Sequence, residues 1–207
     1  MITNLTVRDA PAHPRLFETM YEDRKSIFVD MLKWDIEHDG RKERDQYDTE
    51  AAQYLILNDP DTDEHLGSVR LLPTTDGHIL GDVFAFLCEQ EVPVGPTIWE
   101  ITRLVVSPRV KRRERLVVRN MLGRAMIEYG LLTGIRHYTC VCEMGFLSQL
   151  LASGWRCEPL GLPQCVGNST IGALKIQCDA TSLARTKEGW QFASPVLRVS
   201  QPDQLAA

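Results

Sequence analysis

The sequence lacks several features that would place it outside the ordinary globular class. No run of eighteen consecutive apolar residues occurs in the 207-residue chain, so we expect no membrane-spanning helix. The opening stretch, MITNLTVRDAPAHP, has no apolar core of the length that a signal peptide needs. A basic excess is also missing, because the formal net charge is -5, and this argues against a surface built as a whole for nucleic acid. We therefore expect a soluble protein located in the cytoplasm.

Cysteine patterns typical of disulfide or zinc sites are missing as well. The six cysteines, from Cys88 to Cys178, show no C-x-x-C spacing, so neither a disulfide framework nor a structural zinc site is indicated. His137, Cys140 and Cys142 resemble a metal cluster by residue type. They lie on one expected strand, however, where a C-x-C pair on one face is typical of core. We predict that the protein holds no metal.

Hydrophobic periodicity predicts alternating helices and strands within one domain, residues 1–207. A charged loop is expected over 35–50, and a loosely held tail over about 195–207. Such an order predicts an α/β or α+β sandwich, with a central sheet covered by helices on both faces. The helices are expected over about 14–34, 110–133 and 143–154, and the strands over 51–59, 65–74, 97–106, 137–141 and 169–179.

Charged residues in unexpected places are the strongest functional signal. Glu100 and Arg103 interrupt the apolar strand TIWEITRLVVSP, where an unpaired charge would be costly to bury. Residues three apart face opposite sides of a regular strand, so a bulge or splay is needed if both enter one site. Three acids and three arginines could neutralise one another there; taken singly, the two loop aspartates and the helix arginine also fit ordinary solvated positions. The six are Arg24, Asp45, Asp48, Arg70, Glu100 and Arg103.

In order and spacing, these residues resemble the acyl-homoserine-lactone synthases, the autoinducer synthases of bacterial quorum sensing. The resemblance runs from about Tyr21 to Pro108 and continues more weakly through SGW at 153–155. It is carried by Arg24, Phe28 and Trp34, by Asp45 and Asp48, by Arg70 in SVRLLPT, by Phe84 in GDVFAFL, and by Glu100 with Arg103 in WEITRLVV.

The resemblance implies a fold and a reaction. The fold would be that of the GCN5-related N-acetyltransferases, with the mixed central sheet splayed into a V-shaped cleft between the strands at 97–106 and 137–141. The enzyme would acylate the amine of S-adenosylmethionine from an acyl thioester and close a lactone, releasing 5′-methylthioadenosine. S-adenosylmethionine is then a substrate, and no cofactor is implied. Residues 1–50 would form a partly mobile region that binds it.

Site roles follow from the same resemblance. Glu100 is the expected base for the substrate ammonium, because proton removal needs a carboxylate within reach. Arg103, Asp45, Asp48 and Arg24 would support it electrostatically, and Phe28, Trp34, Arg70 and Phe84 would build the S-adenosylmethionine pocket. We expect the acyl chain to contact Cys142, Met126, Leu150 and Trp155, for which core packing is an equally good interpretation.

The acyl donor would be acyl carrier protein or acyl-coenzyme A. The segment SPRVKRRERL lacks the glycine-rich loop that binds the pyrophosphate of coenzyme A in acetyltransferases, which favours a carrier protein. A basic patch there suits a strongly acidic partner, although a solvated helix start would look similar. The patch comprises Arg109, Lys111, Arg112, Arg113, Arg115 and Arg119.

The sequence leaves two other functions open. One is an acetyltransferase relative that acylates a different amine from acyl-coenzyme A, which the missing glycine loop disfavours. The other is a non-catalytic ligand-binding or carrier-binding domain, which the ordered charged set disfavours.

Overall fold

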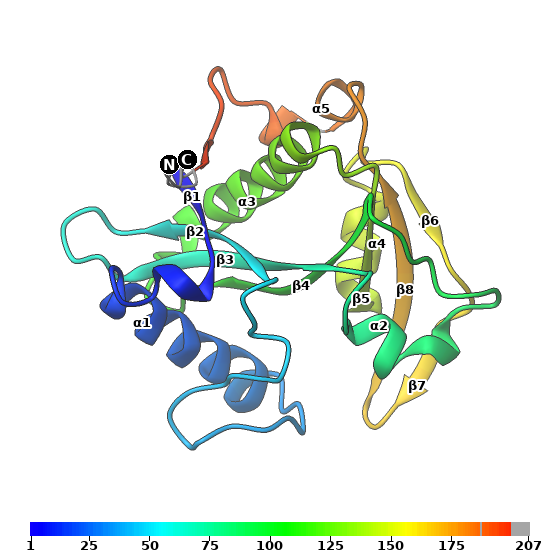
Figure 1. Cartoon of the computed structure of the whole chain (residues 1–207), viewed down its shortest axis with the longest axis horizontal. Coiled ribbons are helices and arrows are strands. Elements are labelled where there is room, and N and C mark those ends of the chain that lie inside the picture. Colours follow the sequence, from blue (N-terminus) through cyan, green and yellow to red (C-terminus); the bar gives the residue numbers. More distant parts are fainter. Residues whose placement is uncertain (187, 200–207) are drawn as a thin grey trace, which may run out of the picture. The chain divides into compact units, whose positions relative to one another are not determined.

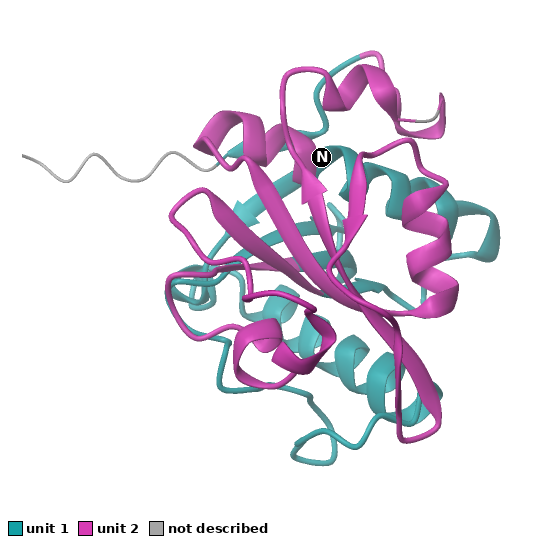
Figure 2. Ribbon diagram, turned by 90° about the vertical axis from the view of Figure 1, so that its right-hand side faces the viewer, with its two compact units in different colours: residues 1–69, 103–125, 194–207 teal, residues 70–102, 126–193 magenta. Residues whose placement is uncertain are grey.

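The computed structural model describes residues 1–186 and 188–199, and the chain in it forms two compact units. Unit 1 comprises residues 1–69, 103–125 and 194–207, and unit 2 comprises residues 70–102 and 126–193 (Figure 2). The chain passes between the units inside two strands and one long helix, and again between residues 193 and 194. The prediction of a single domain stays a prediction.

Unit 1 holds the N-terminal helix and one end of the sheet (Figure 1). Strand β1 pairs with β2 antiparallel and with β9 parallel. Its elements are β1 (Ile2–Leu5), η1 (Val7–Asp9), α1 (Pro14–Arg24), the π-helix η2 (Lys25–Met31), β2 (Gln53–Asn58), the first part of β3 (His65–Pro73), the last part of β4 (Ile98–Val106), the first part of α3 (Arg112–Thr133) and β9 (Leu197–Val199).

Unit 2 holds the rest of β3, β4 and α3 together with the later elements. Strand β5 pairs with β4 parallel and with β8 antiparallel. The further elements are α2 (Ile79–Asp82), η3 (Ala85–Leu87), β5 (His137–Glu143), α4 (Met144–Leu151), β6 (Cys157–Pro159), β7 (Gln164–Val166), β8 (Ser169–Gln177), α5 (Ser182–Arg185) and η4 (Glu188–Trp190).

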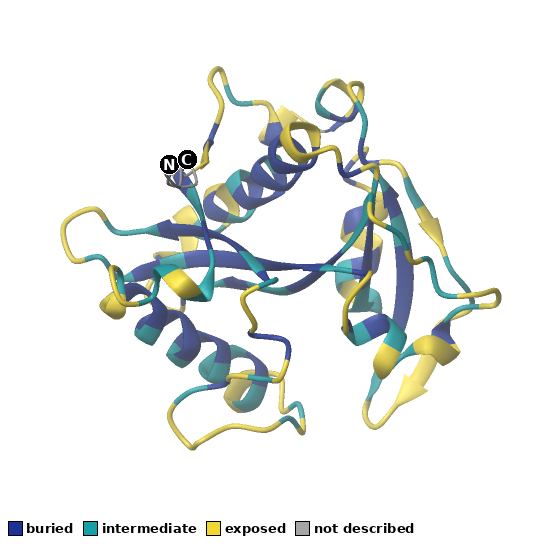
Figure 3. Cartoon of the chain, viewed as in Figure 1, coloured by how far each residue is buried: buried dark blue, intermediate teal, exposed yellow. Residues whose placement is uncertain are grey.

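The strands make a mixed sheet in the order β6-β8-β5-β4-β3-β2-β1-β9, with β7 on β8. Strands β2, β3 and β8 are largely buried and the short strands β6, β7 and β9 are mostly exposed, whereas each helix turns an exposed side to solvent (Figure 3). The buried strands need apolar side chains on both faces, which β2 supplies in the run QYLILN. In the described part of the chain, 1–186 and 188–199, no helix is long and apolar enough to cross a membrane.

Strand β4 is irregular at the position that the sequence singled out. Arg103 has a φ of 49°, in the left-handed region that residues with a side chain rarely adopt. The ladder of β4 with β5 joins 98–101 to 137–140, while β5 goes on with β8 as far as Glu143. The strand therefore has an irregularity of the kind that a shared site for Glu100 and Arg103 would need.

Most of the predicted helices and strands are confirmed, but the loop, the tail and several short strands differ from the prediction. Residues 35–50 form no helix or strand, but Glu43, Tyr47 and Asp48 are buried there, so the prediction of an exposed loop is wrong for them. The short strands β1, β6, β7 and β9 were not predicted. Of the predicted loose tail, residues 197–199 form β9, and residues 200–207 lie outside the described residues.

Candidate active site

A buried ionic cluster in unit 1 forms around Arg24, the last residue of α1. Its guanidinium donates to Glu43 Oε2 at 2.6 Å and to both carboxylate oxygens of Asp48 at 2.7 and 3.0 Å. Asp45 lies 3.8 Å away. Arg24 is only 1% exposed, so its hydrogen bonds are shielded from water. Burial alone would lower the pKa of Arg24, but the ion pairs with Asp48 and Glu43 outweigh it and raise the pKa above its ordinary value.

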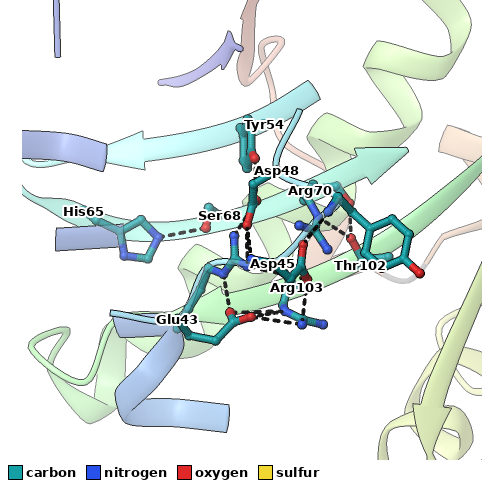
Figure 4. A network of polar contacts seen from close by, with 11 residues as sticks. Glu43, Asp45, Asp48, Tyr54, His65, Ser68, Arg70, Thr102 and Arg103 are labelled. Carbon is teal, nitrogen blue, oxygen red and sulfur yellow. Dashed lines mark hydrogen bonds and ion pairs between the residues drawn. The ribbon is translucent and has the colours of Figure 1, made fainter. Parts of the chain in front are cut away.

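Arg103 joins this cluster from β4 (Figure 4). It forms ion pairs with Glu43 at 3.0 Å and with Asp45 at 2.8 Å. The left-handed backbone at Arg103 turns the side chain from the regular alternation of the strand. Two guanidiniums thus meet three carboxylates, which answers how arginine can be buried here: each charge has an opposite charge and hydrogen bonds.

Glu43 is the functional candidate that sequence reasoning missed. It is fully buried and is the carboxylate shared by Arg24 and Arg103. Its backbone N–H donates to the carbonyl of Tyr21 at 3.1 Å, which anchors the loop to α1. Nothing in the stretch DGRKERDQYD distinguishes Glu43 from its charged neighbours, so no periodicity could have found it.

Aromatic rings lie beside the cluster. Phe28 and Trp34 stack with ring centroids 4.8 Å apart and planes 17° apart. The Arg103 guanidinium carbon lies 5.3 Å from the centre of the Phe28 ring, within cation–π range. The π-helical turn over Lys25–Met31 carries Phe28, and such turns are frequent at functional sites.

In unit 2, Glu100 is buried without a direct ion pair among the contacts described. Its two carboxylate oxygens accept the backbone N–H groups of Ile79 at 2.7 Å and Leu80 at 2.8 Å, the first residues of α2. Burial raises the pKa of Glu100 to about 7, although those two N–H groups and the charge of Arg70 act in the opposite direction. A carboxyl that titrates near neutrality is suited to accept a proton.

Arg70 and Thr102 are linked to each other in the same unit (Figure 4). The Arg70 side chain donates to the Thr102 hydroxyl at 3.0 Å, and that hydroxyl donates to the Arg70 carbonyl at 3.3 Å. The six predicted charged residues therefore fall into two groups: Arg24, Asp45, Asp48 and Arg103 meet in unit 1, and Glu100 with Arg70 lies in unit 2. A single pocket that holds all six stays a prediction.

The other predicted substrate residues lie in unit 2. Phe84 contacts Phe86 edge to face, with ring centroids 6.1 Å apart. Trp155 is buried between Tyr138 and Trp190, and its indole N–H donates to the Gln177 carbonyl at 2.7 Å. Met126 and Leu150 are buried, and Cys142 is half-buried on β5. Their contact with an acyl chain stays a prediction.

The predicted basic patch divides into two kinds of residue. Arg109 makes a double hydrogen bond to buried Asp23, at 3.0 and 2.8 Å, so its charge is already offset. Asp23 also pairs with buried His65, whose other ring nitrogen meets the Ser68 hydroxyl at 2.9 Å. Arg109 is nevertheless exposed, as are Lys111, Arg112 and Arg113; Arg115 and Arg119 are half-buried.

Comparison with known proteins gives the family. The family model described as autoinducer synthase matches residues 11–186. An acyl-homoserine-lactone synthase of Rhizobium etli is 31% identical over 170 residues, which are 80% of this chain and 79% of that protein. The structure of BjaI, a CoA-dependent acyl-homoserine lactone synthase, with SAM and isopentyl-CoA is similar with a TM-score of 0.86 and 26% identity, over 98% of this chain and 94% of that one.

A more distant likeness concerns the fold alone. A predicted N-acetyltransferase of Lactobacillus plantarum matches with a TM-score of 0.53 at 16% identity, over 78% of this chain and 90% of that one. Together with the mixed sheet, it confirms the predicted α/β fold of the acetyltransferase type. The chain belongs to the autoinducer synthase family, because the family model matches residues 11–186 and the synthase of Rhizobium etli is 31% identical over 80% of the chain.

Proposed function

We propose that this chain is an acyl-homoserine-lactone synthase located in the cytoplasm. The α-amine of S-adenosylmethionine attacks the thioester carbonyl, so that a C–N bond forms and the thiol leaves. The methionine carboxylate then attacks the carbon next to the sulfonium, a C–O bond closes the lactone, and 5′-methylthioadenosine leaves. Membership of the family, together with the likeness to an acyl-homoserine lactone synthase that holds SAM and isopentyl-CoA, carries this proposal.

Glu100 serves as the base. The α-amine of the substrate arrives as an ammonium and must lose a proton before it can attack. A pKa of about 7 leaves Glu100 partly ionised at neutral pH, so the carboxylate can take that proton. The hydrogen bonds from Ile79 and Leu80 fix its orientation while leaving further lone pairs on each oxygen.

The ionic cluster of unit 1 serves the cationic substrate. The cluster contains three carboxylates, and acidic neighbours are complementary to a sulfonium. Trp34, which stacks on Phe28, offers an aromatic ring for the same cation. Arg70, in unit 2, is the residue that we assign to the methionine carboxylate.

The acyl donor is a thioester on coenzyme A or on acyl carrier protein. Lys111, Arg112 and Arg113 are exposed, and Leu116 and Val117 beside them are about half exposed. A basic surface with apolar side chains suits an acidic carrier protein. The missing glycine-rich loop supports the same donor, whereas the likeness to a CoA-dependent synthase supports coenzyme A.

One incubation tests the function. Purified protein is mixed with S-adenosylmethionine and a panel of acyl-coenzyme A and acyl-carrier-protein donors, and lactone and 5′-methylthioadenosine are measured by mass spectrometry. We expect both products in equal amounts with at least one donor. If no donor yields 5′-methylthioadenosine but another amine is acylated, the chain is an N-acyltransferase of a different kind.

A further inference from the structure

A row of polar side chains crosses the sheet of unit 2 on the face that carries Glu100. Strand register places Thr139 opposite Glu100, Lys175 opposite Thr139, and Glu158 opposite Lys175. Cross-strand partners share one face of a sheet, and neighbouring strands lie about 4.8 Å apart. The row begins at the fully buried Glu100 and ends at Glu158, whose side chain is 69% exposed.

Thr139 is the anomalous member of this row. It is completely buried, and its hydroxyl has no hydrogen-bond partner among the described residues. A hydroxyl left unpaired in the interior lowers the stability of the folded protein, so valine of the same shape would be the more stabilising residue. A polar group kept at such a cost indicates a function.

Glu100, once protonated, requires a hydrogen-bond acceptor, which a hydroxyl can provide. Its two oxygens each accept one backbone N–H, from Ile79 and Leu80, which suits the ionised form. Once Glu100 takes a proton, its new O–H group needs an acceptor. A threonine hydroxyl both donates and accepts, and rotation about χ1 moves its oxygen among three staggered positions above the strand.

We propose that Thr139 is a positioning residue for the base: its hydroxyl hydrogen-bonds to the Glu100 carboxyl during turnover, as donor to the ionised form and as acceptor from the protonated form. This inference rests on the proposed function, in which Glu100 takes the ammonium proton. Other charges act on Glu100 as well, from Arg70 and Asp82 in the same unit. On the same sheet face, Lys175 pairs with Glu158 at 3.5 Å, and both act on His137.

The test compares Thr139→Val with Thr139→Ser. For Thr139→Val we expect a melting temperature equal to or above that of the wild type, because an unpaired buried hydroxyl is removed. We also expect a fall in kcat of about tenfold, the effect of one lost hydrogen bond in the transition state. The acidic limb of the pH–rate profile should move to higher pH, because the bond to the charged form is the stronger one. Thr139→Ser keeps the hydroxyl and should retain both kcat and the limb.

A matched control and a direct readout make the test decisive. Thr170→Val, at an exposed position of β8, should change neither kcat nor the pH profile. Infrared difference spectra against Glu100→Gln isolate the Glu100 carboxyl, whose protonated C=O band should shift in Thr139→Val. The inference would be overturned if Thr139→Val shifted neither the Glu100 C=O band nor the acidic limb of the pH–rate profile. Equal losses of kcat in the valine and serine variants would also overturn it. If the wild type makes no lactone, the proposed function fails, and the infrared band still decides whether Thr139 bonds to Glu100.

Discussion

The two units bury charge in different ways. In unit 1, Arg24 is surrounded by carboxylates, and its guanidinium meets Glu43 and Asp48 at 3 Å or less. In unit 2, Glu100 is held by two backbone N–H groups. Ion pairs offset the charges of unit 1, whereas burial raises the pKa of Glu100 to about 7, against the effect of the two N–H groups. The arrangement in unit 1 therefore suits a fixed electrostatic field, and the arrangement around Glu100 suits proton transfer.

Removal of the central cation of unit 1 should have the largest effect. Arg24→Ala removes the ion pairs of Arg24 with the buried carboxylates Glu43 and Asp48, which should destabilise the protein by about 3–5 kcal/mol. Urea unfolding measures the loss. Arg8→Ala, which breaks an exposed pair with Glu50, is the control and should cost about 0–1 kcal/mol. Similar losses in the two variants would contradict the scaffold role of Arg24.

The corresponding change in unit 2 should affect the reaction more than the fold. Glu100→Gln keeps one oxygen for a backbone N–H of α2 but cannot take a proton, so we expect kcat to fall by about 100-fold or more. Glu91→Gln, at an exposed site of the same unit, should keep wild-type activity. If Glu100→Gln retained more than a tenth of kcat in steady-state assays, Glu100 would not be the base.

The pH dependence sharpens the contrast between the units. The pKa of Glu100 is raised from 4.5 to about 7, so the native state binds the proton more tightly than the unfolded chain. The contribution of Glu100 to stability is therefore complete below pH 4.5 and is lost as pH rises through 7, by on the order of 3 kcal/mol. Activity should rise over the same interval. Denaturant titrations of wild type and Glu100→Gln at several pH values would show this difference, and parallel curves would refute it.

Reversal of exposed charge should have the smallest effect on the fold. Arg112→Glu with Arg113→Glu lies outside both buried arrangements, so stability should change by no more than about 0.5 kcal/mol. With an acyl-carrier-protein donor, KM should rise by about tenfold at low salt and less at high salt, because screening weakens steering. An unchanged KM in the double variant would mean that this surface contacts only solvent.

Arg109→Ala tests the other kind of residue in this patch. The charge of Arg109 is offset by Asp23, so we expect a loss of stability before a change in KM.

The sequence predicts the helices and strands that have a long hydrophobic pattern and misses the short ones. The helix at Arg112–Thr133 and the strand at Ile98–Val106 were predicted because apolar residues recur over many positions. The strands β1 and β9 were missed because three or four residues carry no periodicity, and they exist only by pairing with each other and with β2. Arg24 and Arg103 were found by their unusual placement, whereas Glu43 was hidden among charged neighbours.

The sequence by itself determined the family, the main helices and strands, and the fact that Glu100 and Arg103 had to find partners inside an apolar strand. Only the tertiary structure decided which partners these are: Glu43 for Arg103, and the N–H groups of Ile79 and Leu80 for Glu100. It also decided that Asp23 offsets the charge of Arg109 within the basic patch. The physical reason is that local pattern fixes backbone conformation, whereas burial and the pairing of charges depend on segments that are distant in the chain and meet only when it folds.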